Sequence, residues 1–195
     1  MISYLSNKLA SYLVKTNCIA DGEFSLYAYG LFLLIANIIF IIVLFIFGAI
    51  FQCIIENLVF YISFRAIRSF AGGYHADTEM RCEILTTLSF FFTTFAIFLS
   101  EQQGVQIIVL FFTIIAIPII AVFSPLDTPA KPLDTDEKKK YRKISFLILS
   151  IIVLIIIVSS IFKIKLLLVP CCLSLILESI LLVAGVIKGR LVNGN

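Results

Sequence analysis

The chain has 195 residues, of which 61% are apolar and only 14% are charged, with 19 phenylalanines and no tryptophan. Soluble domains average about 45–50% apolar and about 25% charged residues. A chain of this length cannot bury so many apolar side chains away from water, so the composition excludes a soluble globular protein and predicts a helical membrane protein. The small net charge of +3 gives no reason to expect a nucleic-acid partner.

Residues 1–22 are expected to form an amphipathic helix that lies in the membrane interface. Apolar and polar side chains in this segment fall on opposite sides of a helix, as an interfacial helix requires. The apolar side carries Ile2, Leu5, Leu9, Tyr12 and Leu13, and the polar side carries Asn7, Lys8, Ser11 and Lys15. A helix packed against the rest of the chain is an equal alternative. Asp21-Gly22 is expected to end the helix, and no signal peptide is expected.

Six apolar segments follow, and each is about long enough to cross a hydrocarbon core of about 30 Å. They cover residues 26–47, 51–70, 84–100, 105–123, 144–162 and 166–187. Gly48 is expected to form a tight corner between the first two, and Pro118 to kink the fourth. The predicted fold class is therefore all-α, a polytopic membrane bundle over 26–187 with about six transmembrane helices, in a single domain spanning 1–195. A four-span alternative makes the 48–70 region re-entrant.

The positions of the positive charges support six spans. With the N-terminus inside, 13 of the 15 lysines and arginines lie in segments that face the cytoplasm, and only Lys163 and Lys165 lie outside. Cytoplasmic loops of membrane proteins retain lysine and arginine. This orientation places both long polar segments, residues 71–82 and 124–143, on the cytoplasmic face.

The first polar segment contains the only histidine, His75, and a cysteine at the predicted start of the third span, Cys82. Asp77 or Thr78 can cap this helix, which places Cys82 near its first turn. A helix N-terminus carries a partial positive charge that favours a thiolate. The residues are therefore compatible with a thiol-based catalytic pair, in which His75 acts first as a base and then as an acid. The alternative is a structural histidine and a cysteine that only packs.

The spacing of this pair requires a break in the helix. On one continuous helix His75 and Cys82 would be about 10 Å apart along the axis, at about 1.5 Å per residue, which is beyond hydrogen-bond reach. Residues 71–77 are therefore expected to be non-helical and to fold back toward the helix start. Gly72 and Gly73 provide the conformational freedom for such a turn.

The other cysteines, Cys18, Cys53, Cys171 and Cys172, lie mostly within apolar runs. An odd number of cysteines in this pattern argues against a disulfide framework, and most of these thiols are expected to pack as small apolar groups. A single histidine with scattered cysteines provides no paired ligand spacing. Neither a metal nor another cofactor is expected.

The run Arg68-x4-Gly73-x-His75-Ala76-x5-Cys82, between spans of a polytopic chain of this length, resembles the accessory gene regulator protein B family. Members of that family are membrane cysteine endopeptidases that process the precursors of cyclic quorum-sensing peptides in Gram-positive bacteria. The resemblance covers nearly the whole chain. The loop Pro125–Pro132 is similar to the Pro-rich basic loop of the family, and Glu178 lies in the last span, where the family often has a glutamate.

The resemblance implies that Cys82 is the nucleophile and His75 its base. Arg68 and Gly73 would be positions needed for activity, with Gly72 as a further supporting residue. The expected activity is cleavage of the propeptide through an acyl-enzyme, followed by cyclisation to a lactone or thiolactone. A third member of the catalytic group, or a polar support for it, stays open among Asp77, Glu79, Glu56 and Glu178.

The expected partners are the lipid bilayer of a bacterial cell membrane and a propeptide with an amphipathic N-terminus and an acidic C-terminus. Four basic residues of the second polar segment are candidates for contact with that acidic end: Lys131, Lys138, Lys139 and Lys140. The run 138–143 more simply anchors the topology. Self-association into a homo-oligomer stays open.

Two other classes of function are compatible with these residues. In a small-molecule or peptide transporter or channel, Glu56 and Glu178 would line a pathway and His75 would relay protons. The lack of an internal repeat weighs against this class. The other class is a non-catalytic membrane scaffold.

Overall fold

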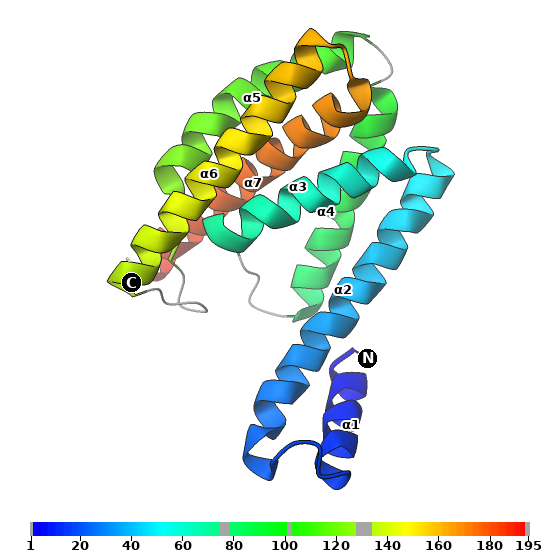
Figure 1. Cartoon of the computed structure of the whole chain (residues 1–195), viewed down its shortest axis with the longest axis vertical. Coiled ribbons are helices and arrows are strands. Elements are labelled where there is room, and N and C mark those ends of the chain that lie inside the picture. The colour runs from blue at the N-terminus through cyan, green and yellow to red at the C-terminus, as the bar shows by residue number, and fades with distance from the viewer. Residues whose placement is uncertain (1, 75–78, 101–102, 128–133, 194–195) are drawn as a thin grey trace. The chain divides into compact units, whose positions relative to one another are not determined.

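The computed structural model describes residues 2–74, 79–100, 103–127 and 134–193. Within its helices, residues 79, 80, 82, 83, 103 and 191–193 are described by their backbone alone. The described ranges form seven α-helices and one short 3-10 helix, and they contain no β-strand (Figure 1). The predicted all-α class is therefore confirmed.

The helices follow one another with short connections. Their bounds are α1 Ile2–Lys15, η1 Asp21–Glu23, α2 Phe24–Ile50, α3 Ile54–Ala71, α4 Glu79–Leu99, α5 Gln103–Phe123, α6 Thr135–Ile161 and α7 Lys165–Asn193. The chain divides into two compact units, Met1–Ile46 and Phe47–Asn195. The boundary falls inside α2, and each unit is described by itself below.

In the first unit, α1 is shorter than the sequence indicated. It ends at Lys15 rather than at Asp21-Gly22, because Asn17 adopts a left-handed conformation with a φ of 54°. The amide of Cys18 then donates to the carbonyl of Leu13 at 2.9 Å, as in a common helix-ending motif. Leu5, Leu9 and Tyr12 are exposed, which is the arrangement that an interfacial helix requires.

All six predicted spans are helical, but only four helices are long and apolar enough to cross a membrane by length and composition. These are Asp21–Ile50, Gly104–Phe123, Thr135–Ile161 and Lys165–Arg190. The apolar part of α4, Ile84–Leu99, is shorter, and α3 carries Glu56, Arg65 and Arg68. Length and composition alone therefore do not decide whether α3 and α4 cross the membrane.

The contacts within the second unit indicate how α3 runs. Its first turn lines a cavity together with Lys165 and Pro170 at the start of α7. Just beyond its last turn, the amide of Tyr74 donates to the carbonyl of Leu181, which lies in the second half of α7. Helix α3 thus runs parallel to α7 over a length of about 27 Å, at about 1.5 Å per residue. Since α7 is long enough to span the membrane, this arrangement favours the six-span topology.

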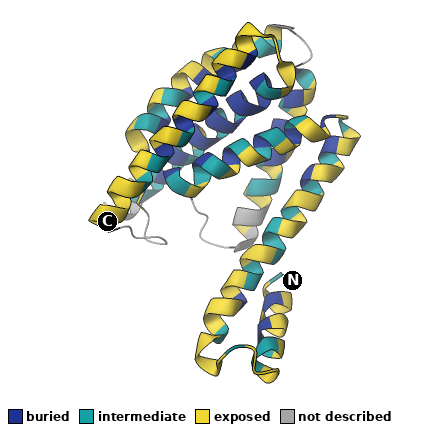
Figure 2. Cartoon of the chain, in the orientation of Figure 1, coloured by how far each residue is buried: buried dark blue, intermediate teal, exposed yellow. Residues whose placement is uncertain are grey.

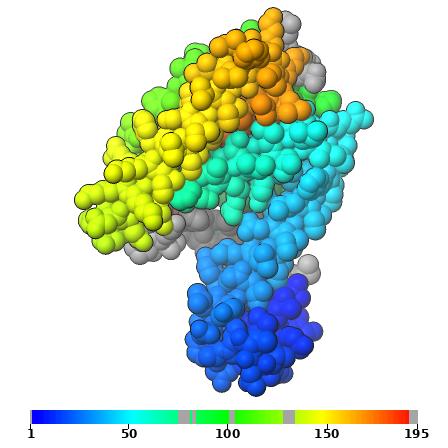
Figure 3. Space-filling view, in the orientation of Figure 1, coloured from blue at the N-terminus to red at the C-terminus, as the bar shows by residue number. Residues whose placement is uncertain are grey.

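Helix α7 is the centre of the second unit. It packs against α3, α5 and α6, and more lightly against α4. It is the most buried of the long apolar helices (Figure 2), and the space-filling view shows only a strip of it between α6 and α3 (Figure 3). The core around it contains Ile67, Ala71, Ala116, Ile120, Leu149, Ile152, Cys171, Cys172, Leu175 and Leu182.

Gly48 does not form the corner between α2 and α3 that the sequence suggested. It lies within α2, and the left-handed residue at the corner is Gln52, with a φ of 57°. A β-carbon on Gly48 would lie 2.9 Å from the Cα of Ile54. This glycine therefore allows the start of α3 to approach the end of α2 closely.

Helix α6 begins earlier than the predicted span at 144. Asp134 caps it by accepting a hydrogen bond from the amide of Thr135 at 2.7 Å, and the Glu137 side chain accepts one from the Asp134 amide. Such reciprocal caps stabilise a helix start. The basic run 138–143 is consequently helical. Helix α4 likewise begins at Glu79, ahead of its apolar run.

The topology can be tested with single cysteines placed at the two ends of α3. In a chain that lacks its native cysteines, Gln52→Cys should react with a membrane-impermeant maleimide on intact cells. Ser69→Cys should react only after the cells are permeabilised. Both positions are exposed, so labelling depends on the side of the membrane, with Thr135→Cys as an inside control and Ser160→Cys as an outside control. Labelling of positions 52 and 69 from the same side would indicate the re-entrant alternative instead.

Candidate functional site

The end of α3 forms the sharp turn that the sequence predicted at the two glycines. The helix stops at Ala71, one residue later than predicted, and Gly72, Gly73 and Tyr74 are non-helical. The rest of the predicted non-helical stretch, residues 75–77, lies outside the described residues. Gly72 has a φ of 76° and Gly73 a φ of 135°, values that residues with a β-carbon rarely adopt. One unbroken helix from Arg68 to Cys82 is therefore excluded, as the proposed pairing of His75 with Cys82 requires.

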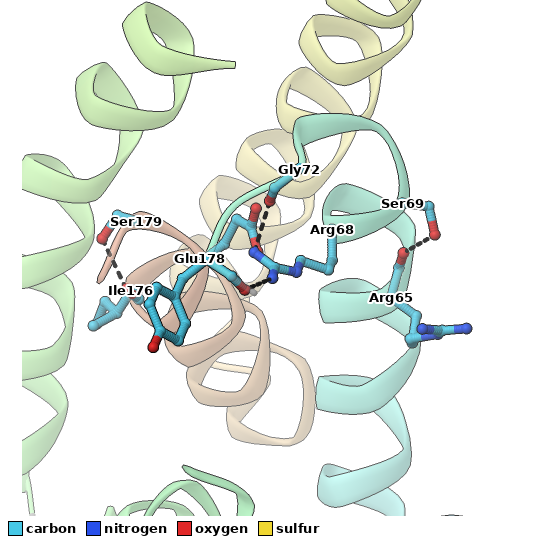
Figure 4. A network of polar contacts seen from close by, with 8 residues as sticks. Arg65, Arg68, Ser69, Gly72, Ile176, Glu178 and Ser179 are labelled. Atoms are coloured by element: carbon cyan, nitrogen blue, oxygen red, sulfur yellow. Dashed lines mark hydrogen bonds and ion pairs between the residues drawn. The ribbon is translucent and has the colours of Figure 1, made fainter. Parts of the chain in front are cut away.

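Arg68, in the last turn of α3, holds this turn in place (Figure 4). Its Nη1 donates to the carbonyl of Gly72 at 2.7 Å, and its Nη2 donates to the carbonyl of Tyr74 at 2.6 Å. Hydrogen bonds from a charged donor contribute about 1.5–3 kcal/mol each. The planar guanidinium can bridge two carbonyls in a way that a lysine cannot. Gly73 has no side chain where a β-carbon would overlap Arg68 Nη1.

Glu178, in the middle of α7, provides the counter-charge for Arg68. Its Oε2 lies 3.8 Å from Arg68 Nη1, and its side chain is 0% exposed against 16% for Arg68. Within the described residues, neither carboxylate oxygen accepts a hydrogen bond. The contact is therefore an ion pair without a direct hydrogen bond, in a water-poor setting where the attraction between opposite charges is larger but the removal of both groups from water is costly.

The backbone after the turn is fixed directly to α7. The amide of Tyr74 donates to the carbonyl of Leu181 at 2.9 Å, and Lys188 lies over the Tyr74 ring at 5.1 Å from its centroid. A β-carbon on Gly185 would lie 2.5 Å from Leu126 Cδ2 and 2.9 Å from the Tyr74 amide. Gly185 thus provides the space in which the 72–74 segment docks.

The second polar segment meets the first at this point. The amide of Leu126 donates to the carbonyl of Ala71, the last residue of α3, at 2.8 Å. Asp127 forms an ion pair with Lys138 at 2.6 Å, which ties the loop to the start of α6. Leu126 and Asp127 therefore connect the end of α3 to the start of α6.

The structure places the proposed nucleophile at a helix start. Cys82 is the fourth residue of α4, which begins at Glu79, so its backbone lies in the first turn as predicted. Its side chain, and that of Glu79, lie outside what the structure describes. His75, Asp77 and Lys131 also lie outside the described residues.

The remaining candidates are divided between the two ends of the second unit. Glu56 lies in the first turn of α3, twelve residues before Arg68 or about 18 Å along the helix, and it lines a cavity of about 240 Å³ with Gln52, Cys53, Ser100 and Lys165. The structure thus does not bring Glu56 to Arg68, whereas it does bring Glu178 there. Lys139 pairs loosely with Asp136 at 3.7 Å, and Lys140 is exposed on α6.

Among the described residues, no group of histidine, cysteine or acidic side chains could hold a metal ion. Cys53, Cys171 and Cys172 are free and buried, whereas Cys18 is free and exposed. Cys171 and Cys172 belong to the core around α7.

Sequence reasoning missed two of the residues that build this site, Leu181 and Gly185, and it identified Leu126 only as part of the loop Pro125–Pro132. Leu181 contributes only a backbone carbonyl, so no side-chain pattern could have identified it. Gly185 did carry a signal, because small residues in membrane helices often allow close packing against a neighbouring segment.

Comparison with known proteins gives a consistent family assignment. Residues 6–182 match the sequence model of the family described as Accessory gene regulator B. An AgrB-like protein of Clostridium perfringens strain SM101 is 33% identical over 154 residues, which cover 73% of this chain and 69% of that protein. Accessory gene regulator protein B of Staphylococcus aureus strain Newman is 30% identical over 161 residues, which cover 80% of this chain and 84% of that protein. No solved structure matches the chain.

Two glycines of α7 provide a matched test of the docking site. Gly185→Ala should destabilise the purified protein by about 1–3 kcal/mol, because the added methyl group would displace Leu126 and the Tyr74 amide. Gly189→Ala, one turn further on, has nothing within 4 Å of its β-carbon. It should stabilise the helix by up to about 1 kcal/mol. Thermal unfolding in detergent measures both changes, and equal effects of the two substitutions would contradict the close contact at Gly185.

Proposed function

Because this chain belongs to the accessory gene regulator B family, we propose that it is a membrane-embedded cysteine endopeptidase. Its substrate is a quorum-sensing propeptide, which it cleaves through an acyl-enzyme and helps to cyclise to a lactone or thiolactone. The observation that carries the proposal is the break between α3 and α4. Cys82 lies in the first turn of a helix, and the chain that leads to His75 is fixed by a sharp, anchored turn.

In the proposed mechanism, His75 removes the proton from the Cys82 thiol, and the start of α4 stabilises the resulting thiolate. The thiolate adds to the carbonyl carbon of the scissile peptide bond. Collapse of the tetrahedral intermediate breaks the C–N bond, and His75 returns the proton to the leaving amine. The products of this step are the free C-terminal peptide and a thioester on Cys82.

Ring closure then follows by a second acyl transfer. A thiol or hydroxyl of the bound peptide loses its proton to His75 and attacks the thioester, which releases the cyclic product and regenerates the Cys82 thiol. A site that excludes water favours this intramolecular attack over hydrolysis, since the internal nucleophile has a high effective concentration.

The basic run at the start of α6, which Leu126 and Asp127 connect to the end of α3, supports an acidic end on the propeptide. Lys140 is exposed on α6, whereas Lys138 is already paired with Asp127. The charge distribution of the chain supports a position of this site on the cytoplasmic side of a bacterial cell membrane. A transporter receives less support, because Glu178 is the counter-charge of Arg68 and is not free to bind a transported ion.

Substitutions at the proposed pair test the function directly. Cys82→Ala should abolish cleavage of a co-expressed precursor peptide, because no other group replaces the nucleophile. His75→Ala should reduce cleavage by about 10²–10⁴-fold, with partial recovery at higher pH as hydroxide deprotonates a thiol of ordinary pKa, about 8.5.

The control for this experiment replaces Cys18, Cys53, Cys171 and Cys172 together by alanine or serine, which should leave most of the cleavage intact. An immunoblot of the membrane fraction shows that each variant reaches the membrane. A Cys82→Ala protein that still cleaves and cyclises the precursor would eliminate the proposed mechanism.

A further inference from the structure

We infer that Glu178 is a positioning residue for this reaction, acting through Arg68 on the backbone that leads into His75. The inference rests on the proposed function, in which His75 is the base. Glu178 does not touch the reacting groups in this account. It determines where the Arg68 guanidinium lies, and the guanidinium in turn determines the path of residues 72–74.

Glu178 is fully buried and therefore needs a partner of opposite charge. A fully buried carboxylate within a span-length apolar helix is costly unless it has a partner of opposite charge. Its oxygens accept no hydrogen bond within the described residues, and Arg68 lies 3.8 Å away. The carboxylate is thus arranged to attract a charge and not to complete a hydrogen-bond network.

Without this carboxylate, Arg68 would be drawn toward water. Arg68 lies in the last turn of α3, and its side chain is 16% exposed. Long basic side chains near the end of a span extend toward water when nothing holds them inside. Arg65, one turn earlier on the same helix, is exposed and points away from Glu178 (Figure 4). Glu178 therefore opposes the tendency of Arg68 to turn outward in the same way.

Arg68 is connected to the proposed base through the backbone of residues 72–74. Its guanidinium binds the carbonyls of Gly72 and Tyr74, and the Tyr74 amide binds the carbonyl of Leu181. Both backbone polar groups of Tyr74 are thereby fixed, which sets the direction of the chain into residue 75. If Arg68 turned outward, the partly buried carbonyls of Gly72 and Tyr74 would lose this donor and the turn would be free to move.

Three residues on one face of α7 contact Arg68 or the turn at residues 72–74. Glu178, Leu181 and Gly185 are separated by three and four residues, so they lie on one face of the helix. They supply a negative charge, a backbone acceptor and an open space, respectively. All three requirements concern the same short segment, residues 72–74.

A purely structural ion pair would also explain a buried Arg68–Glu178 contact, and a double substitution separates the two roles. Replacement of a buried ion pair by apolar residues of similar size often leaves folding intact. Arg68→Met with Glu178→Leu should therefore reach the membrane and fold, because it leaves no buried charge unpaired. It nevertheless lacks the donors for the Gly72 and Tyr74 carbonyls, so a positioning role predicts that the function is lost.

The test uses two measurements that need no peptide substrate. Hydrogen–deuterium exchange of the Tyr74 amide reports whether the turn stays on α7. The rate at which N-ethylmaleimide alkylates Cys82 as a function of pH reports whether a base supports the thiolate, in a parent chain that lacks the other four cysteines. Glu178→Gln, the double variant and the control Arg65→Gln are compared with this parent chain.

In Glu178→Gln and in the double variant, Tyr74 exchange should rise at least about tenfold. The alkylation midpoint should move up toward the value of an ordinary thiol, about 8.5, while Arg65→Gln matches the parent. Cleavage of the co-expressed precursor should fall on the order of 10²-fold, as expected for misplacement of a catalytic group by about 1 Å.

Wild-type exchange and an unshifted profile in either variant would overturn the role of Glu178. If Glu178→Gln does not accumulate in the membrane, unchanged Tyr74 exchange in the double variant still overturns the inference, because Glu178 is proposed to act only through Arg68. Raised exchange in the double variant supports the role of Arg68 in holding the turn. A parent chain whose Cys82 titrates as an ordinary thiol would instead argue against the proposed function, and the exchange data would still show whether Glu178 holds the turn.

Discussion

A positive charge at the end of α3 has to be held inside an apolar bundle, and much of the second unit is arranged around that requirement. Arg68 lies close enough to an end of the unit to reach water, yet it is mostly buried beside Glu178. Its guanidinium binds two carbonyls of a turn that would otherwise leave them without a donor. The charge, the counter-charge and the two carbonyls are interdependent, because loss of Arg68 would remove the counter-charge of buried Glu178 and the shared donor of both carbonyls.

Helix α7 provides the fixed surface against which this turn is held. It lies in the middle of the second unit and contributes Cys171, Cys172, Leu175 and Leu182 to the core. A helix packed on several sides has little freedom to move, because protein interiors are close-packed. The face that carries Glu178, Leu181 and Gly185 can therefore define the position of the turn at residues 72–74.

The two polar segments of the chain are parts of one structure. Leu126 binds the last carbonyl of α3 and fills the space beside Gly185, while Asp127 joins the loop to Lys138 on α6. Residues that are distant in sequence thus converge at one end of the unit, near the proposed catalytic segment. The opposite end holds Glu56 and Lys165 around a separate cavity, so the acidic side chains within α3 and α7 belong to different environments.

The sequence alone determined the membrane class, the helical segments and the turn at Gly72-Gly73, because these depend on local composition and conformational preference. It also identified Arg68 and Glu178 as polar residues that an apolar bundle must accommodate, but it left Glu178 among four acidic candidates. The predicted span 51–70 already placed Glu56 and Arg68 at opposite ends of one helix. Only the tertiary structure paired Glu178 with Arg68 and gave Leu126, Leu181 and Gly185 a role. Pairing of this kind depends on how α3 and α7 align, and that alignment is set by side-chain packing between segments about 110 residues apart, which no local pattern encodes.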